Sequence, residues 1–557
     1  MNHQTKIVPV LIVGGGPVGL SLALSLARHD IDSLLVEKHQ GRTEHPRARG
    51  VSMRSMELFQ QWGNITELLK YEFPKEAIRF IWSESLQGNE ITRVEIKNIK
   101  QYSHGDLGAS FVTQDCVELY LQETLNEHPN AQIEYSKEMV SFEEEADGVT
   151  VRLLDRKNDK EEIVKTKFLI AADGARSPTR KQLGIEMQGP DSLGQFCNVF
   201  CEFDISEWTS SRPSIGYFFT DPKIISRSLF MAYGKNRWIF GMRFAADNTR
   251  DDFTDDYCLN EIRRVLDLPN MAIKIINKNF WSMAAQIAQQ YRKGRVLLVG
   301  DAAHRMPPTG GLGMNTGIAD AHNLAWKLAF ILNHQLNDNL LDSYFDERAP
   351  VAKRNIEWSI QNAKRFAEIA QAIHSGNNEK LKIKLQEQQA NLNYEGLDLG
   401  YIYHSNAILS ENNETMSVLP GKYVPTTLPG SRAPYVKLVK NGKTISTLDL
   451  FEKEFVLLLG SDGYEWQAAA EQLVKSILFP IKIYRVANHG DLIDVDNQWH
   501  QVYEITTTGA VLVRPDGHVA WRSQSIVGEP VEVLRNVFGL YPLHYSQEFP
   551  LKNAGTP

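Results

Sequence analysis

A glycine-rich turn between a strand and a helix constrains this chain more than any other feature. Val8–Val13 is a short apolar run typical of a buried strand, and Gly14–Gly19 (GGGPVG) follows it with the GxGxxG spacing. The first glycine permits a tight turn, the second lets a pyrophosphate approach the backbone, and the third lets helix and strand pack closely. Unpaired N–H groups at the start of the next helix favour phosphate. The turn therefore predicts a dinucleotide site.

The same segment could be mistaken for a membrane-spanning helix, because Val8 to Ala27 carries no charge. Its glycines and prolines are poor material for a spanning helix, and its two halves have different patterns. The first half is typical of a strand, and the second, LSLALSLA, is typical of a helix. No other stretch is long enough to cross a bilayer, so we expect a soluble cytoplasmic protein with no membrane partner.

Charge and cysteine content argue against several further classes of protein. A net charge of −8 argues against a nucleic-acid partner. The 4 cysteines are too few for a disulfide framework in 557 residues and fit a reducing compartment. Cys197 and Cys201 lie close in sequence, but no second Cys/His pair stands at zinc-ligand spacing. We therefore expect buried thiols and no metal site.

Three later segments add side chains that suit a dinucleotide. A second apolar strand ends at Glu37, where a carboxylate can accept the ribose hydroxyls. Lys167–Gly184 is a strand followed by Asp173-Gly174 and by a helix that Ser177 caps. Arg295–Ala329 is a strand that ends at Asp301, followed by a glycine-rich loop and a long helix. The backbone of this loop suits developing negative charge, as on a reduced flavin.

In this order along one chain, these motifs resemble the class A flavoprotein aromatic hydroxylases, which are FAD monooxygenases of the para-hydroxybenzoate and phenol hydroxylase type. The resemblance covers about residues 7 to 410 and rests on GGGPVG with Glu37, HPRARGVSMRSMEL, ADGARSPTR and GDAAHRMPPTGGLGMNTGIADAHNLAWKLA. Arg212–Ser214, Leu340–Arg354 and Gly396–Ser405 are most similar to the chlorophenol and aromatic-polyketide hydroxylase branch.

The resemblance implies FAD as the cofactor and a set of residues around it. Gly14, Gly16 and Gly19, with Pro17, would hold the pyrophosphate, and Glu37 with Lys38 the adenosine ribose. Arg47 would reach the diphosphate or adenosine side, Gln114 and Asp301 the ribityl chain, and Asp173 would couple FAD binding to the nicotinamide reductant. The loop Pro308, Gly311, Leu312, Gly313, Met314 and Asn315 would cradle the flavin N1/O2 edge. Alternatively, Arg47 is a surface ion-pairing residue and Gln114 a helix cap.

The expected fold class is α/β: a Rossmann-like FAD-binding domain with an inserted antiparallel-sheet substrate domain and a C-terminal thioredoxin-like domain. The expected FAD-binding domain comprises 1–74, 111–185 and 291–350, and the substrate sheet 75–110 and 186–290. A helical segment (351–409), a linker (410–434) and the thioredoxin-like unit (435–557) follow. No cysteine lies beyond Cys258, so this unit has no thiol redox role, and we expect a structural or dimer-forming one.

Aromatic residues of the predicted sheet are available to line a substrate chamber: Phe200, Tyr217, Phe218, Phe219, Phe230, Tyr233, Trp238 and Phe240. Most are expected in the core, and a minority against a ligand. No catalytic acid or base is evident; Tyr217, Tyr233 and Arg243 are weak candidates, and His304 is expected to pack.

The resemblance implies hydroxylation of a phenolic or polycyclic aromatic substrate with NAD(P)H and O2, through a flavin C4a-hydroperoxide. With a single dinucleotide motif, the nicotinamide would dock transiently. The alternatives are a non-catalytic flavin-binding or interaction protein and another FAD oxidoreductase on the same fold. A disulfide reductase would need a redox CxxxxC near the first helix, and a halogenase a WxWxIP segment; neither is present. The substrate, the choice between NADH and NADPH, and a homodimer stay open.

Overall fold

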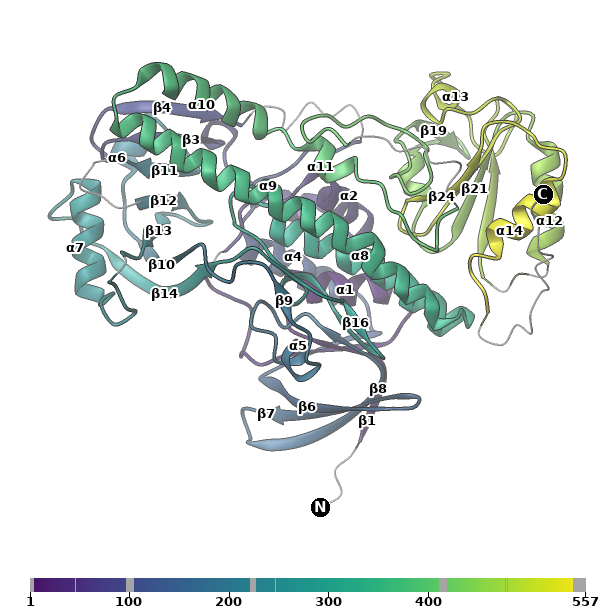
Figure 1. The fold of residues 1–557 in the computed structure, drawn as a ribbon, viewed down its shortest axis with the longest axis horizontal. Coiled ribbons are helices and arrows are strands. Elements are labelled where there is room, and N and C mark those ends of the chain that lie inside the picture. Colours follow the sequence, from purple (N-terminus) through teal and green to yellow (C-terminus); the bar gives the residue numbers. More distant parts are fainter. Residues whose placement is uncertain are drawn as a thin grey trace.

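The computed structural model places two sheets and a C-terminal unit along one long helix (Figure 1). It describes residues 5–45, 47–96, 105–220, 227–245, 247–409, 418–475, 477 and 479–543. Among these residues, no helix combines the length and the apolar character that crossing a membrane requires. Cys116, Cys197, Cys201 and Cys258 are all buried free thiols, as expected.

The first sheet is built around parallel strands, whose carboxyl ends meet at one edge. Its strands, in spatial order, are β16 (Arg292–Lys293), β17 (Val296–Leu298), β8 (Lys160–Ala171), β1 (Lys6–Val13), β2 (Ser33–Glu37) and β5 (Ala131–Tyr135). The β17–β8, β8–β1, β1–β2 and β2–β5 pairs are parallel. A hairpin of β6 (Lys137–Glu145) and β7 (Gly148–Asp155) is attached to β8. The predicted motifs after β1, β2, β8 and β17 thus come together at this edge.

Helices pack against this sheet because their apolar residues are buried there. Helix α1 (Pro17–Arg28) is buried continuously from Gly19 to Ala27 and contacts both α4 (Gln114–Leu125) and α8 (Leu312–His334). The predicted strand–turn–helix at the amino end is therefore confirmed. The remaining helical elements of this part are α2 (Met53–Trp62), α3 (Ile65–Leu69), η1 (Lys75–Ala77), α5 (Pro178–Gln182), η2 (Gly300–Ala302) and η3 (Asp338–Leu341).

The second sheet comes from the two inserted segments. Its spatial order is β14 (Lys274–Met283), β10 (Gly194–Glu202), β13 (Arg237–Arg243), β12 (Arg227–Met231), β11 (Gly216–Phe219), β3 (Arg79–Ser83) and β4 (Glu90–Glu95). It is antiparallel as predicted except for one pair, β3–β11, which is parallel. The physical reason is that β3 and β11 come from different insertions, so no tight hairpin joins them. Smaller elements nearby are α6 (Ser206–Thr209), β9 (Met187–Gln188), β15 (Gln286–Ala288) and β18 (His304–Arg305).

The two faces of the second sheet have different surroundings. One face buries an apolar cluster with α7 (Asp255–Leu266) that contains Cys197, Tyr217, Leu229 and Phe240. The other face lies beside α9 (Asp342–His374), which runs from the first sheet along the second, as Figure 1 shows. α10 (Asn378–Asn391) packs on α9, and α11 (Glu395–Leu399) follows. Helices thus cover most of the expected helical segment 351–409, but α9 begins before it, at Asp342, and α11 ends at Leu399.

The C-terminal unit is a four-stranded sheet in the order β22 (Ile481–Arg485), β21 (Phe455–Leu459), β23 (Ala510–Val513) and β24 (Val519–Ser523). The turn at Pro515-Asp516-Gly517 joins β23 and β24 as predicted. Its other elements are β19 (Lys437–Lys440), β20 (Lys443–Ser446), η4 (Thr447–Leu450), α12 (Tyr464–Val474), α13 (Trp499–Val502) and α14 (Pro530–Phe538).

The expected linker, residues 410–434, is packed against the rest of the protein in the part that the structure describes. Residues 410–417 lie outside the described residues, whereas Tyr423, Thr427 and Arg432 are buried. The guanidinium of Arg432 pairs with the Glu57 carboxylate of α2. Polar composition suggested a solvated segment, but these polar groups are paired inside the protein instead.

Candidate functional site

A cavity of about 2170 Å³ joins the carboxyl edge of the first sheet to the open face of the second. The predicted glycine turn, the segment around Arg47, the 301–314 loop and α9 all contribute to its wall. The predicted cofactor motifs and the predicted aromatic sheet therefore share one cavity.

The glycines of the first turn have different surroundings. Gly14 has a φ of +114°, and a Cβ there would lie 2.3 Å from the carbonyl oxygen of Ala172. A Cβ on Gly19 would lie 2.0 Å from the carbonyl oxygen of Gly14, so Gly19 packs beneath the turn and does not line the cavity. Gly16, which precedes Pro17 at the start of α1, lines the cavity and has nothing within 4 Å of an added Cβ. Space for a ligand therefore lies at Gly16.

Glu37 is held at the end of β2 by the backbone. Its carboxylate accepts hydrogen bonds from Gly15 N and from His39 N, both at 2.8 Å. Glu37 and Lys38 both line the cavity beside the glycine turn. This is the position expected for an acid that accepts ribose hydroxyls.

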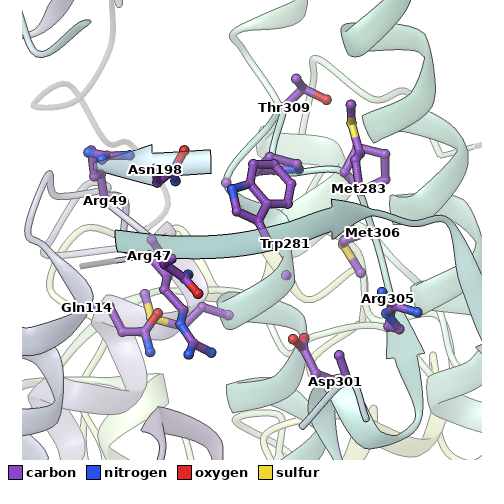
Figure 2. Close-up of a pocket in the computed structure, with 18 of the residues that line it drawn as sticks. Arg47, Arg49, Gln114, Asn198, Trp281, Met283, Asp301, Arg305, Met306 and Thr309 are labelled. Atoms are coloured by element: carbon purple, nitrogen blue, oxygen red, sulfur yellow. The ribbon is translucent and has the colours of Figure 1, made fainter. Parts of the chain in front are cut away.

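Arg47 and Gln114 lie around the same part of the cavity as Asp301 (Figure 2). Arg47 is exposed to the cavity, and no ion pair of its guanidinium occurs among the described residues. Gln114 begins α4 and donates from Nε2 to the Glu118 carboxylate at 2.8 Å. Burial raises the pKa of Glu118 to about 7, so this pair sits in a poorly hydrated part of the wall.

Asp301 presents an unpaired carboxylate to the cavity within the described part of the chain. Loss of bulk water raises its pKa, while His304, Arg47 and Arg305 oppose that rise. Hydroxyl groups that donate to this carboxylate would stabilise its charged form. His304 does not line the cavity; its Nε2 lies 2.6 Å from the buried Asp320 carboxylate.

The 308–315 loop meets the cavity with part of the predicted set. Pro308, Gly311, Gly313 and Met314 line it, and Gly311 has a φ of +66° with open space at its Cβ position. Leu312 and Asn315 are buried instead. The Asn315 amide accepts from Ser52 N and donates to the carbonyl oxygens of Gly50 and Gly311. Its side chain therefore braces the loop, and the prediction that the loop backbone cradles the flavin edge stays a prediction.

Asp173 lines the cavity and also caps α5. Its Oδ2 accepts from Thr179 N at 3.1 Å and from Thr179 Oγ1 at 2.7 Å. Its Oδ1 is buried without a protein partner among the described residues. One carboxylate oxygen thus caps the helix, and the other is buried without a hydrogen-bond partner in the described part of the chain.

Three of the eight aromatic candidates line the cavity: Phe218, Phe219 and Phe230. Two of the three weak catalytic candidates, Tyr217 and Tyr233, do not line the cavity. Tyr217 is fully buried in the α7 cluster and donates from its hydroxyl to the carbonyl oxygen of Arg212, and Tyr233 lies outside against Tyr71. Strand alternation turns Tyr217 away from its neighbour Phe218. Arg243 does line the cavity.

Sequence reasoning missed most of the chamber wall. Phe80, Trp82, Phe196, Trp281 and Phe366 line it, as do Asn198, Asn279 and Ser228. Alternation along each strand could have sorted these residues into two faces, but no local signal shows which face meets the cavity.

Two family models match the chain. The model described as FAD binding domain matches residues 7–359, and the one described as aromatic-ring hydroxylase, C-terminal, matches residues 426–540.

Two curated relatives match almost end to end. The tetracenomycin A2 monooxygenase-dioxygenase of Streptomyces glaucescens is 34% identical, with 96% of each chain covered. The 2,4-dichlorophenol 6-monooxygenase of Cupriavidus pinatubonensis is 29% identical, with 95% of this chain and 96% of the relative covered.

Two solved structures share the fold. The flavin-dependent monooxygenase PieE, in complex with FAD and substrate, superposes with a TM-score of 0.87 at 29% identity, covering 96% of this chain and 99% of that one. The ternary complex of aklavinone-11 hydroxylase with FAD and aklavinone gives a TM-score of 0.82 at 30% identity, covering 96% and 98%.

Proposed function

Because the chain belongs to the family of FAD-binding aromatic-ring hydroxylases, we propose that it uses NAD(P)H and O2 to hydroxylate a phenolic or polycyclic aromatic substrate. The observation that carries this proposal is that one cavity is lined both by a nucleotide-binding turn and by an aromatic sheet face. A cofactor and a flat ring can therefore lie in contact with each other. The relatives named as monooxygenases of tetracenomycin A2 and of 2,4-dichlorophenol support the same class of substrate.

The cavity wall fits FAD in charge and in space. The open position at Gly16, beside the first turn of α1, suits the pyrophosphate, and the guanidinium of Arg47 supplies a positive charge for it. The carboxylates of Glu37 and Asp301 suit hydroxyl groups of the ribose and the ribityl chain. The open backbone at Gly311, beside the amino end of α8, suits the negatively charged edge of a reduced flavin.

When bound, FAD supplies the redox and oxygen chemistry of this family, and the protein orients the reactants and limits access of water. The aromatic side chains Phe80, Trp82, Phe218 and Phe366 give one end of the chamber a dry wall. A ring held against this wall would be positioned by shape, and polar contacts would fix its orientation. No acid or base beside the substrate has to be assumed for this role.

We also propose the domain limits that the sequence predicts and a cytoplasmic setting. NAD(P)H would dock transiently, without a separate nucleotide-binding domain. The four buried, unbridged thiols support the cytoplasmic setting. The ion pairs that join the C-terminal unit to α8 and α9 support a structural role for that unit.

The test is steady-state oxidation of NADH and NADPH by the purified, FAD-loaded protein across phenols, hydroxynaphthoquinones and fused-ring polyketides. We expect at least one aromatic compound to accelerate NAD(P)H oxidation and to yield a hydroxylated product in mass spectrometry. An FAD-loaded protein that shows neither effect with any compound would be a flavin-binding protein, which is the alternative function.

A further inference from the structure

Six residues stand directly opposite one another across the second sheet and face the cavity. Asn279 of β14 is opposite Asn198 of β10, Asn198 is opposite Gly241 of β13, and Gly241 is opposite Ser228 of β12. The register continues to Phe218 of β11 and Trp82 of β3. Opposite residues share a face of a sheet, and all six line the cavity. We call Asn279, Asn198, Gly241 and Ser228 the polar row, and Phe218 with Trp82 the aromatic end.

The side chains of the polar row have unused hydrogen-bonding capacity. Within the described residues, neither amide nor the Ser228 hydroxyl has a hydrogen-bond partner, and all three face the cavity. The neighbouring Asn277 of the same strand shows the contrast, because its Oδ1 lies 2.5 Å from His45 Nδ1 and it does not line the cavity. An aromatic chamber with three unpaired polar side chains in one line is built for a ligand with polar atoms.

Gly241 lies between Asn198 and Ser228 in the middle of the polar row. A Cβ on Gly241 would lie 2.7 Å from Ser228 Oγ and 3.5 Å from Asn198 Oδ1. These contacts show that the glycine faces the same side as its two polar neighbours. Its missing side chain leaves room for the Ser228 hydroxyl, which occupies the space that a Cβ would need.

The aromatic end continues the same line with a flat apolar wall. The rings of Trp82 and Phe218 stack at a centroid distance of 5.0 Å, and Phe366 of α9 stacks on Trp82 at 5.7 Å. At about 4.8 Å between strands, the polar row spans about 14 Å and the aromatic end about 10 Å more. This length exceeds that of a single benzene ring, so the line suits fused rings.

We propose that the polar row binds the oxygen-bearing edge of a fused-ring phenol or quinone, whose apolar rings extend over the aromatic end. The proposal rests on the function proposed above and identifies its substrate class. Carboxamides and a hydroxyl both donate and accept, so they match neighbouring hydroxyl and carbonyl groups without requiring a charge. A ring system that lacks these oxygens would leave the amides unpaired in the chamber, which weakens its binding.

The experiment compares two probes on the FAD-loaded protein. One is a dihydroxyanthraquinone whose two hydroxyl groups flank one carbonyl, and the other is anthracene, which has three fused rings and no oxygen. Dissociation constants come from the change in flavin absorbance. We expect the wild-type protein to prefer the dihydroxy probe at least tenfold. Asn198→Ala, Asn279→Ala and Ser228→Ala should each weaken binding of the dihydroxy probe about fivefold to tenfold and leave the affinity for anthracene unchanged.

Asn277→Ala is the matched control, since it removes an amide from the same strand outside the cavity. It should keep the wild-type preference. Gly241→Ala should weaken binding of the dihydroxy probe, because its methyl group would displace the Ser228 hydroxyl. FAD content and the midpoint of thermal unfolding identify any misfolded variant. If the asparagine variants misfold, Ser228→Ala still tests the inference, because it removes a single oxygen atom.

The inference fails if the wild-type protein binds neither probe, binds both equally, or keeps its preference in the three alanine variants. Stimulation of NAD(P)H oxidation by simple phenols in that situation would leave the proposed function standing. Failure of every aromatic compound to stimulate the wild-type protein would overturn the proposed function itself.

Discussion

At the residue scale, the glycines of the first turn serve different purposes. Gly14 adopts a left-handed φ and has a carbonyl 2.3 Å from its missing Cβ, whereas Gly16 faces open space. The sequence pattern treats them alike, because both fit GxGxxG. The structure separates a glycine that the fold requires from one that a ligand would require.

Alanine substitutions should reveal this difference. Gly14→Ala should destabilise the protein by about 3 kcal/mol or more, since it combines backbone strain with a steric clash. Gly16→Ala should change stability by less than about 0.5 kcal/mol but lower FAD content, since its methyl group enters the pyrophosphate space. Thermal unfolding and the ratio of flavin to protein absorbance measure the two effects. A Gly16→Ala protein with full FAD would contradict this placement.

Local motifs made much of the cofactor site predictable. Glu37 ends one strand and Asp301 follows another, each in a recognisable pattern, and both line the cavity. Asn198 and Ser228 carry no such pattern, because their meeting depends on the register of β10, β13 and β12. Tyr217 and Phe218 are adjacent in sequence and face opposite sides, which only the packing of α7 decides.

At the element scale, Asp320 ties three elements together behind Asp301. This buried carboxylate of α8 accepts from Gly300 N at 3.3 Å and from Arg348 Nε of α9 at 2.7 Å, and it pairs with His304. Burial alone would raise the pKa of Asp320, but His304 and Arg348 hold it below its ordinary value. Asp320 is therefore a positioning residue for the strand end that carries Asp301.

Asp320→Asn should destabilise the fold by about 3–5 kcal/mol, because it leaves the Arg348 guanidinium buried without its counter-charge. It should also reduce FAD affinity, since Gly300 and His304 flank Asp301 in sequence. Urea unfolding and flavin titration measure the two effects. Asp338→Asn is the control: its pair with Arg295 is partly exposed, so the loss should stay below about 1 kcal/mol. Equal losses in the two variants would refute the role of Asp320.

At the scale of the whole molecule, the C-terminal unit is fixed to the cofactor-binding part by buried charges. Arg514, at the end of β23, pairs with Glu347 of α9 at 2.6 Å, and Lys327 of α8 pairs with the same carboxylate at 2.9 Å. Arg54 of α2 donates to the carbonyl oxygen of Asp516 at 2.8 Å. The sequence predicted this unit and its hairpin turn, but not its attachment, because the partners lie far apart along the chain.

Arg514→Met should remove the central cation of this attachment and leave Lys327 as the one cation paired with Glu347 among the described residues. We expect a loss of about 3–5 kcal/mol in the free energy of unfolding, measured in urea. Arg152→Met, at an exposed pair with Glu161, should cost less than about 1 kcal/mol. If Arg514→Met lost no more stability than the control, these ion pairs would not be what holds the C-terminal unit in place.

The central claim is that one cavity holds the flavin and the aromatic ring together, and transfer of oxygen from O2 to the ring tests it most directly. FAD-loaded protein would be incubated with NAD(P)H, an accelerating aromatic compound and isotopically labelled dioxygen. The account predicts a hydroxylated product that carries one labelled oxygen atom. NAD(P)H oxidation that leaves no labelled oxygen in an aromatic product would contradict it.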